Sequence, residues 1–482
     1  MIQLSHRSAS LWSEAHFSRA ELPDHRLRKR LVAVGARMAE RPGWSFPRLF
    51  PNPGELKGAY RLLHHRSATP AALQAGHRER TRAEMKRTAM VVLPEDTTTF
   101  SWTGNEPIKG LGPVGKGLKG SQGFLAHTTL AVAWPASDDG EGKRPPVNCI
   151  GVAHQILHVR KGRPAGETRD NKRARLGRER ESQFWERTSE ALGPAPDGVV
   201  WRRVSDRESD IYEYLLSCQA LGHGFVVRAC QDRRLEDPKG EYLFAAARSA
   251  PALGKMELEL RGRKGKPGRT ARLTVQGRTV TLAPPAGAKA KLGHPPIPCR
   301  LIRVVETHPP EGGEALEWVL LTDVETWGGE ALAEPTFADA TEAIRQYTTR
   351  WLAEDFHLAI KSGGMKAESL QLESGQALMA AVALMSVTAL RLVEFRERVR
   401  RLAEEPADQA GLTEVELTVL RAATGRKIAK VREVALAIGH LGGHLNRKGD
   451  GMPGVLSLWR GMEQLTAMVI GFQLANPRHG CG

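Results

Sequence analysis

Three acidic segments, far apart in this sequence, have the composition expected of a divalent-metal site that acts on phosphodiesters. Residues 95–98 (EDTT) and residues 205–210 (SDRESD) each end a run of apolar residues, and residues 347–361 carry a third acid. Magnesium prefers oxygen ligands. Two such ions about 3.5–4 Å apart can activate an attacking oxygen and stabilise a leaving oxygen. The candidate catalytic residues and metal ligands are Asp96, Asp206 and Glu354.

The third segment combines its acid with groups that bind phosphate. On an α-helix, at about 100° per residue, four of its side chains fall within about 60° of one another. They are Tyr347, Arg350, Glu354 and Lys361. An arginine can bind a phosphate through two parallel hydrogen bonds, and a lysine adds a compact charge. A solvated helix with an i, i+4 ion pair between Arg350 and Glu354 is the alternative.

Composition favours a polyanionic partner. The 482 residues are enough for about two to four domains. Lys and Arg number 70 against 54 Asp and Glu, a formal charge of +16. Such an excess is typical of nucleic-acid binders, although a merely basic soluble protein has it too. Because the chain holds 54 Asp and Glu residues, any three of them taken alone are weak evidence for a site. The three candidates are informative only because of the residues around them.

The sequence also indicates a compartment. Its five cysteines form no CxxC pair, so we expect neither a zinc site nor a disulfide framework. Residues 1–12 lack the apolar core of a signal peptide. The longest apolar stretch, residues 377–390, is too short for a membrane span. We expect a soluble cytoplasmic protein that makes no membrane contact.

The first 70 residues are predicted to be helical and basic. Asp24 is a candidate N-cap, and the residues after it form two stripes. The apolar stripe consists of Leu27, Leu31, Val34 and Met38. The basic stripe consists of Arg26, Arg30 and Arg37. The basic stripe is either a solvated edge or a surface that binds DNA phosphates.

Strands must position the first two acids. Residues 88–96 are predicted to form a strand ending at Asp96, although Pro94 is unusual in a central strand. Residues 198–204 lead into Asp206, and a helix is expected from residue 211. Further strands are predicted at 127–134 and 149–157. Between these two strands and the 198–204 strand, the charge-dense residues 169–187 suggest a solvated helix.

A β-rich block is expected over residues 223–325, followed by helices from residue 338. Its strands are predicted at 225–228, 256–260, 300–305 and 317–322, with a hairpin turning at Gln276 and Gly277. The loop 261–266 is strongly basic. In the tail, an apolar stripe over residues 455–472 either packs within the chain or pairs with a second subunit.

The glycine-rich segment 104–123 resembles a phosphate-binding loop without completing it. Residues 110–116 (GLGPVGK) are followed by Gly117 where such a loop has a Ser or Thr hydroxyl. We therefore expect a flexible basic loop and no nucleotide cofactor.

The chain resembles bacterial DDE transposases of the Tn-five type, in the insertion-sequence-four family, along nearly its whole length. Residues 95–98 and 206–211 resemble the first two acid motifs of the family. Tyr347, Arg350, Glu354 and Lys361 match its Y-R-E-K signature in full, and Phe356 and His357 occupy the place of its Phe-His pair. Residues 24–30 and 58–61 resemble the domain that binds transposon ends. Residues 160–187 match poorly.

The resemblance implies a multidomain α/β protein. An RNase-H-like catalytic core (residues 71–370) would carry a β-rich insertion at about 223–325. A helical N-terminal domain (1–70) would bind DNA ends, and a helical C-terminal domain (371–482) would dimerise. The activity implied is cut-and-paste transposition: nicking at transposon ends, formation and opening of a hairpin, and strand transfer to target DNA.

The resemblance also implies partners and residue roles. Two Mg²⁺ ions, for which Mn²⁺ substitutes, would be held by the three acids. DNA contacts would come from Tyr347, Arg350, Lys361, Arg228, Arg26 and Arg30, and Trp318 would stack on a flipped base. The partners would be duplex DNA, as terminal inverted repeats and as target, and a second copy of the chain. The protein would be bacterial, cytoplasmic and nucleoid-associated when bound to DNA.

Two alternatives stay open. A catalytically silent relative would bind transposon ends and act as a regulator or inhibitor. The presence of all three acids and their basic partners argues against silence without excluding it. A generic metal-dependent nuclease would have no need of the 1–70 region or of the helical tail.

Overall fold

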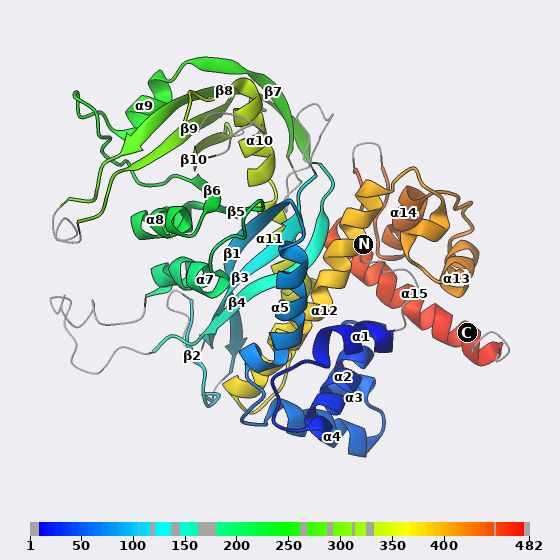
Figure 1. The fold of residues 1–482 in the computed structure, drawn as a ribbon. Coiled ribbons are helices and arrows are strands. Elements are labelled where there is room, and N and C mark those ends of the chain that lie inside the picture. The colour runs from blue at the N-terminus through cyan, green and yellow to red at the C-terminus, as the bar shows by residue number, and fades with distance from the viewer. Residues whose placement is uncertain are drawn as a thin grey trace.

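The protein is a mixed α/β, multidomain molecule built around one large sheet (Figure 1). The computed structural model describes residues 9–104, 106–115, 121–135, 145–161, 180–260, 268–286, 293–310, 314–323, 332–447 and 450–476. The basic loop 261–266, residues 116–120 of the glycine-rich loop, and most of the charge-dense segment 169–187 lie outside these ranges.

Four helices form the N-terminal part of the chain: α1 (Ala9–Phe17), α2 (His25–Glu40), α3 (Phe46–Leu49) and α4 (Pro53–Leu63). The predicted N-cap is confirmed, since Asp24 accepts a hydrogen bond of 2.8 Å from the Leu27 backbone N–H. The four apolar residues of the predicted α2 stripe are all buried. Burial of this stripe leaves the basic edge of α2 facing outward.

The sheet has ten strands. They are β1 (Met90–Thr103), β2 (Gly112–Pro113), β3 (Ser121–Ala133), β4 (Asn148–His158), β5 (Val200–Ser205), β6 (His223–Arg228), β7 (Ala252–Leu260), β8 (Arg269–Leu282), β9 (Ile297–Glu306) and β10 (Glu317–Thr322). The order is β2-β3-β1-β5-β6-β10-β9-β8-β7, and β4 pairs with β3. The strands β1, β5 and β6 run parallel, and the remaining pairings are antiparallel.

Helices cover both faces of the sheet's centre (Figure 1). One face is covered by α5 (Pro70–Met85), α11 (Arg350–Leu358) and α12 (Gly375–Arg401). The other face is covered by α7 (Phe184–Leu192) and α8 (Tyr212–Ala220). In the sequence, the short 3₁₀ turn η1 (Glu181–Gln183) precedes α7, and the 3₁₀ turn η2 (Arg207–Ser209) precedes α8. Toward the β-rich end lie α9 (Leu243–Ser249) and α10 (Phe337–Tyr347).

The predicted hairpin at Gln276 and Gly277 is wrong. β8 is one continuous strand of 14 residues that passes through both positions. A Cβ on Gly277 would lie 2.8 Å from Leu253 and 2.9 Å from Ile302, so this glycine permits close packing of side chains. The other predicted strands are present, but two of their boundaries are wrong: β1 runs on to Thr103 instead of ending at Asp96, and β3 begins at Ser121 instead of at residue 127.

The prediction of one unbroken α-helix through residues 347–361 is also wrong. α10 ends at Tyr347, and α11 begins at Arg350. The Thr348 and Thr349 hydroxyls donate back to carbonyls three residues earlier, both at 2.6 Å, a bond that competes with regular helix geometry. After α11 the chain forms a π-helical turn, η4 (Ala359–Gly363), then the 3₁₀ turn η5 (Ala367–Ser369).

Helices make up the C-terminal part. After α12 come η6 (Ala407–Ala410), α13 (Glu414–Thr424), α14 (Val431–Leu441) and α15 (Val455–Ala475). By length and composition α12 is apolar enough to cross a membrane, but 78% of its most apolar window is buried inside the structure. It packs against β4, α5 and α11, which is the environment of a core helix.

Candidate active site and DNA-binding groove

The first two acids lie side by side just past the point where the parallel pairing of β1 with β5 ends, Asp96 within β1 and Asp206 directly after β5. β1 and β5 are paired in register up to Pro94 and Val204, and Asp96 and Asp206 each lie two residues further on. Neighbouring strands are about 4.8 Å apart, and residues two apart face the same side of a sheet. The two carboxylates therefore share one face. The Asp206 carboxylate also caps η2, accepting a hydrogen bond of 2.9 Å from the Glu208 backbone N–H.

A buried ion pair joins the same two strands on the opposite face. Glu95 and Arg203 have fully buried side chains and bind each other directly. Burial works against the guanidinium charge, but Glu95, Tyr214 and Cys218 together outweigh burial and raise the pKa of Arg203. Arg203 also donates to Ser189 of α7 at 2.9 Å. This pair stabilises the strand ends directly behind the two acids.

The third acid is on α11, which packs against β1. Glu354 Oε1 lies 2.7 Å from Arg350 Nη1, so the alternative ion pair considered from the sequence is present. Burial opposes the Arg350 charge, whereas Tyr347, Glu354 and Asp96 together raise the pKa of this guanidinium. Arg350 therefore lies near Asp96 as well. Its Nε is buried and, within the described residues, has no hydrogen-bond partner.

Aromatic and basic groups extend the site past Asp206. Arg228 follows the last paired position of β6, opposite Asp206 in the β5–β6 register, and donates to the Glu317 carbonyl at 2.9 Å. Burial raises the pKa of the Tyr347 hydroxyl, against the effect of Arg350 and Arg228 beside it. The Trp318 ring contacts Tyr347 edge-on with centroids 4.9 Å apart, and Trp318 is only 6% exposed. A base could reach Trp318 only after a rearrangement.

Lys361 lies at a different point along β1. Its Nζ donates to the Thr99 carbonyl at 2.5 Å and lies 3.6 Å from Glu368 Oε1. The π-helical turn that carries it departs from the α-helical angle used in the sequence argument. The structure thus brings Asp96 and Asp206 together and places Arg350, which pairs with Glu354, near Asp96. Tyr347 and Arg228 lie beside this group, and Lys361 lies against the β1 backbone.

Two residues at the site, Glu208 and His357, were not among the predicted site residues, although both lie in segments that resemble the family's motifs. Burial, followed by the charges of Asp206 and Asp96, raises the pKa of Glu208, so this carboxylate lies close to both acids. His357 Nδ1 lies 3.3 Å from Asp96 Oδ2. Spacing offered a signal for both residues. Glu208 follows Asp206 by two positions, and His357 follows Glu354 by three, on the same face of α11.

The acids at the strand ends fit a hard divalent cation. Mg²⁺ is commonly held by one or two carboxylates, with water and substrate phosphate completing its shell. Burial, and after it the charges of Asp206 and Asp96, raises the pKa of Glu208, and a bound cation would relieve the second of these effects. Within the described residues, no group of three or more His, Cys, Asp or Glu side chains is arranged to hold a metal. Glu354, the third candidate acid, is paired with Arg350 in this structure.

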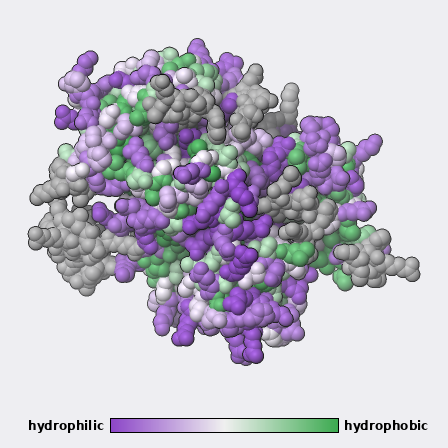
Figure 2. Space-filling model, viewed as in Figure 1, coloured by the Kyte–Doolittle hydropathy of each residue, from purple (hydrophilic) through white to green (hydrophobic). Residues whose placement is uncertain are grey.

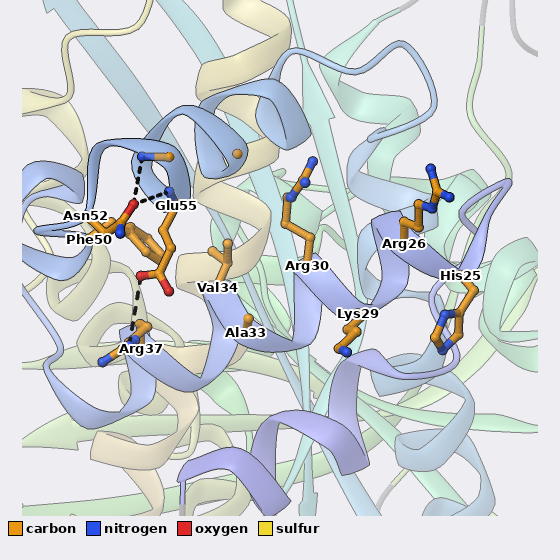
Figure 3. Close-up of a pocket in the computed structure, with 12 residues that line it drawn as sticks. His25, Arg26, Lys29, Arg30, Ala33, Val34, Arg37, Phe50, Asn52 and Glu55 are labelled. Atoms are coloured by element: carbon orange, nitrogen blue, oxygen red, sulfur yellow. Dashed lines mark hydrogen bonds and ion pairs between the residues drawn. The ribbon is translucent and has the colours of Figure 1, made fainter.

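A basic groove lies in the N-terminal part, between α2 and α4 (Figure 3). It has a volume of about 770 Å³, and Arg26 and Arg30 line it, together with His25, Lys29 and Arg37. Hydrophilic side chains cover the lower lobe in Figure 2, where these helices lie. Gly58 lets Arg30 lie against α4, since a Cβ there would be 3.1 Å from Arg30 Nε. The groove therefore presents arginines along one side of α2.

The groove lies in a segment of the chain that matches a known protein family. Residues 9–68 match the family model described as Transposase DNA-binding. The matched residues contain all of α1 to α4 and the groove. The match supports a transposase whose N-terminal helices bind DNA.

A solved structure also aligns with the chain. It is the cryo-EM structure of a piggyBac transposase synaptic complex with hairpin DNA, aligned over 99% of this chain and 84% of that chain. The identity is 9% and the TM-score 0.36.

Proposed function

We propose that this protein is a metal-dependent DDE transposase of the bacterial Tn-five type, with Asp96, Asp206 and Glu354 as its catalytic acids. The observation that carries the proposal is the parallel register of β1 and β5. It runs to Pro94 and Val204, two residues before Asp96 and Asp206, and α11 packs on β1 with Arg350 and Glu354. The same chain carries the N-terminal match to transposase DNA-binding domains. A generic nuclease would not need that segment.

The order of the central strands supports an RNase-H-like core. Along β4-β3-β1-β5-β6, the first three strands pair antiparallel and the last three parallel. That arrangement is the one expected for such a core, with acids on its first and fourth strands in chain order. Strands β7 to β10 then extend the sheet from β6, in keeping with an inserted β-rich segment.

The cofactor proposed is Mg²⁺, with Mn²⁺ as a substitute, in a two-ion site. Asp96 and Asp206 would hold the ions together with Glu354. Bound ions would supply Lewis-acid activation of the attacking oxygen and stabilisation of the leaving oxygen. The chain's own groups would position the DNA. Arg350, with an unsatisfied Nε, and Arg228 would bind phosphates beside the acids.

Trp318 is proposed to stack on a base flipped out during hairpin formation. Its ring lies against Tyr347 at the edge of the site, so a modest shift of one ring would expose a stacking surface. Substituting Trp318 with alanine should impair hairpin formation more than the first nick. Equal loss in both steps would contradict this role.

The groove is proposed to bind the transposon end, and α15 to pair with a second copy of the chain. Transposition of both ends needs two active sites, and a homodimer supplies them. Near its end α15 exposes Met468 and, at 80% exposure, Leu474, which suits a partner helix.

One observation favours a second candidate, a silent protein that binds ends and regulates transposition. The Arg350–Glu354 ion pair leaves the third acid occupied. If the pair persisted with DNA bound, the ion site would stay incomplete and the protein would bind without cleaving.

An assay with the DNA that flanks the gene separates the two candidates. Inverted repeats found there would be incubated with the protein and Mg²⁺. We expect nicks at the repeat ends, which Asp96→Asn or Asp206→Asn abolishes while DNA binding persists. Asp197→Asn, at an exposed acid outside the site, is the matched control. Binding without any cleavage by the parent protein would favour the silent regulator.

A further inference from the structure

His357 is in direct contact with the first acid. It lies on α11, three residues after Glu354, with a side chain that is 5% exposed. Its Nδ1 is 3.3 Å from Asp96 Oδ2. Because an ionised carboxylate only accepts hydrogen bonds, Nδ1 carries the proton and donates it. The other ring nitrogen, Nε2, is buried and has no hydrogen-bond partner within the described residues. Within the described residues, the hydrogen bond from Nδ1 to Asp96 is therefore the one hydrogen bond that the His357 ring makes.

The two strand-end acids are held in the same way. Asp206 Oδ1 accepts a hydrogen bond from the Glu208 backbone N–H, as Asp96 Oδ2 does from His357. Within the described part of the chain, no hydrogen bond involves the other oxygen of either carboxylate. Each acid thus has one oxygen fixed by the protein and one left for a ligand.

We propose that His357 is a positioning residue that orients the Asp96 carboxylate toward the metal. The inference rests on the proposed function, since it assumes a metal at Asp96 and Asp206. Ligands of a metal are held by hydrogen bonds from the residues behind them, and losing such a bond typically weakens metal affinity about 10–100-fold. Asp206 receives this bond from its own backbone turn, whereas Asp96 lies within a strand and depends on α11.

The main alternative is that His357 only fills space between α11 and β1. The neighbouring strand position offers a control. His127 is also buried, and its Nδ1 lies 2.9 Å from the Thr97 hydroxyl, one residue past Asp96 and on the other face of β1. Both histidines pack on β1, but only His357 contacts a proposed ligand.

Two substitutions separate the hydrogen bond from the packing. The amide nitrogen of asparagine reaches the place of Nδ1, and that of glutamine reaches the place of Nε2. Mn²⁺ binding to the full-length protein without DNA would be measured by the electron paramagnetic resonance of free Mn²⁺. We expect His357→Gln to weaken Mn²⁺ binding about 10–100-fold and His357→Asn to leave it within about threefold of the parent. His127→Asn should leave it unchanged.

Thermal unfolding of the same variants tests the alternative. If His357 only fills space, both substitutions should lower the midpoint temperature of unfolding, and the Asn and Gln variants should bind Mn²⁺ with equal affinity. Equal Mn²⁺ affinities for His357→Asn and His357→Gln, whether weakened or not, would overturn the proposal. The Asp96→Asn variant tests the proposed metal site separately from the role of His357. If Asp96→Asn binds Mn²⁺ as tightly as the parent, the proposed metal site itself fails. If only Asp96→Asn loses binding, the role of His357 fails alone.

Discussion

The Arg350 guanidinium occupies the Glu354 carboxylate, with Nη1 and Oε1 2.7 Å apart, at the edge of the two-acid site. Two of the three proposed ligands thus lie together while the third is paired with a cation on its own helix. A phosphate that bound Arg350 would free Glu354. Phosphate binding would then raise the affinity for the metal and, because such coupling is reciprocal, metal binding would raise the affinity for phosphate.

We predict that Arg350→Gln tightens Mn²⁺ binding to the DNA-free protein, because Glu354 becomes available as a third carboxylate. In the parent, adding duplex DNA should tighten Mn²⁺ binding about fivefold or more, within the usual range of coupling. In Arg350→Gln the effect of DNA should be much smaller. Titration of Mn²⁺ with and without duplex measures both effects.

Arg272→Gln is the control for that titration, since Arg272 forms an exposed ion pair with Glu257 far from the acids. It should behave as the parent does. An Arg350→Gln protein whose Mn²⁺ affinity equals that of the parent would show that the ion pair does not limit the site.

The strands that carry Asp96 and Asp206 were predictable because their signal is local. An apolar run followed by an acid indicated β5 and its end before Asp206 correctly, and parallel pairing brings Asp206 beside Asp96. The same signal gave a strand end at Asp96 that is wrong, because β1 continues to Thr103 in antiparallel pairing with β3. The cap at Asp24 and the buried stripe of α2 were predictable for the same reason, since both depend on neighbours within a few residues.

The predictions that were wrong concern features that depend on tertiary packing. Gly277 carries a turn signal, but in β8 it makes room for side chains from distant segments. The helical projection of residues 347–361 could not include the hydroxyl bonds of Thr348 and Thr349, so it placed Lys361 beside the acids and missed its contact with Thr99. The burial of Trp318 against Tyr347 likewise depends on where α10 meets the sheet.

We predict acid destabilisation through two histidines between α1 and α5. His77 Nε2 accepts from the Val152 N–H at 3.0 Å, so its Nδ1 carries the proton and donates to His16 Nδ1 at 2.8 Å. Both rings must therefore be neutral. Burial, with Arg80 and Arg391 nearby, lowers the pKa of His16 from 6.5 to about 3. Burial, with His16, Arg80 and Arg78 nearby, lowers the pKa of His77 well below 6.5.

The direction follows from linkage. Folded pKa values below the unfolded ones mean that the unfolded chain binds more protons, so stability is retained above pH 6.5 and lost as pH falls. At pH 5 the shift of His16 alone should cost about 2 kcal/mol, and His77 adds to this loss in the same direction. Urea unfolding at pH 7.5 and pH 5 would measure the loss. His16→Leu should show a smaller loss on acidification, whereas exposed His308→Asn should match the parent.

The buried pair behind the acids yields a stability prediction. Arg203→Leu leaves the Glu95 charge buried without its partner and should cost about 3–5 kcal/mol. Arg19→Leu removes an exposed ion pair with Glu79 and should cost less than about 1 kcal/mol. Equal losses in urea unfolding would mean that the Glu95–Arg203 pair has no special role. Removing both partners as Glu95→Leu and Arg203→Leu should recover part of the loss, since no unpaired charge remains.

The groove arginines should control the salt dependence of DNA binding. Each phosphate contact adds about 0.9 to the slope of the logarithm of affinity against the logarithm of salt concentration, because binding releases counterions. Arg26→Ala or Arg30→Ala should each weaken binding to the transposon end and reduce that slope by about 1. Arg19→Ala, in the same N-terminal part but outside the groove, should leave the slope unchanged. Fluorescence anisotropy at several salt concentrations would measure the slopes. A flat salt response of the parent protein would contradict a phosphate-dominated groove, since arginines that bind DNA only through phosphates cannot do so without releasing ions.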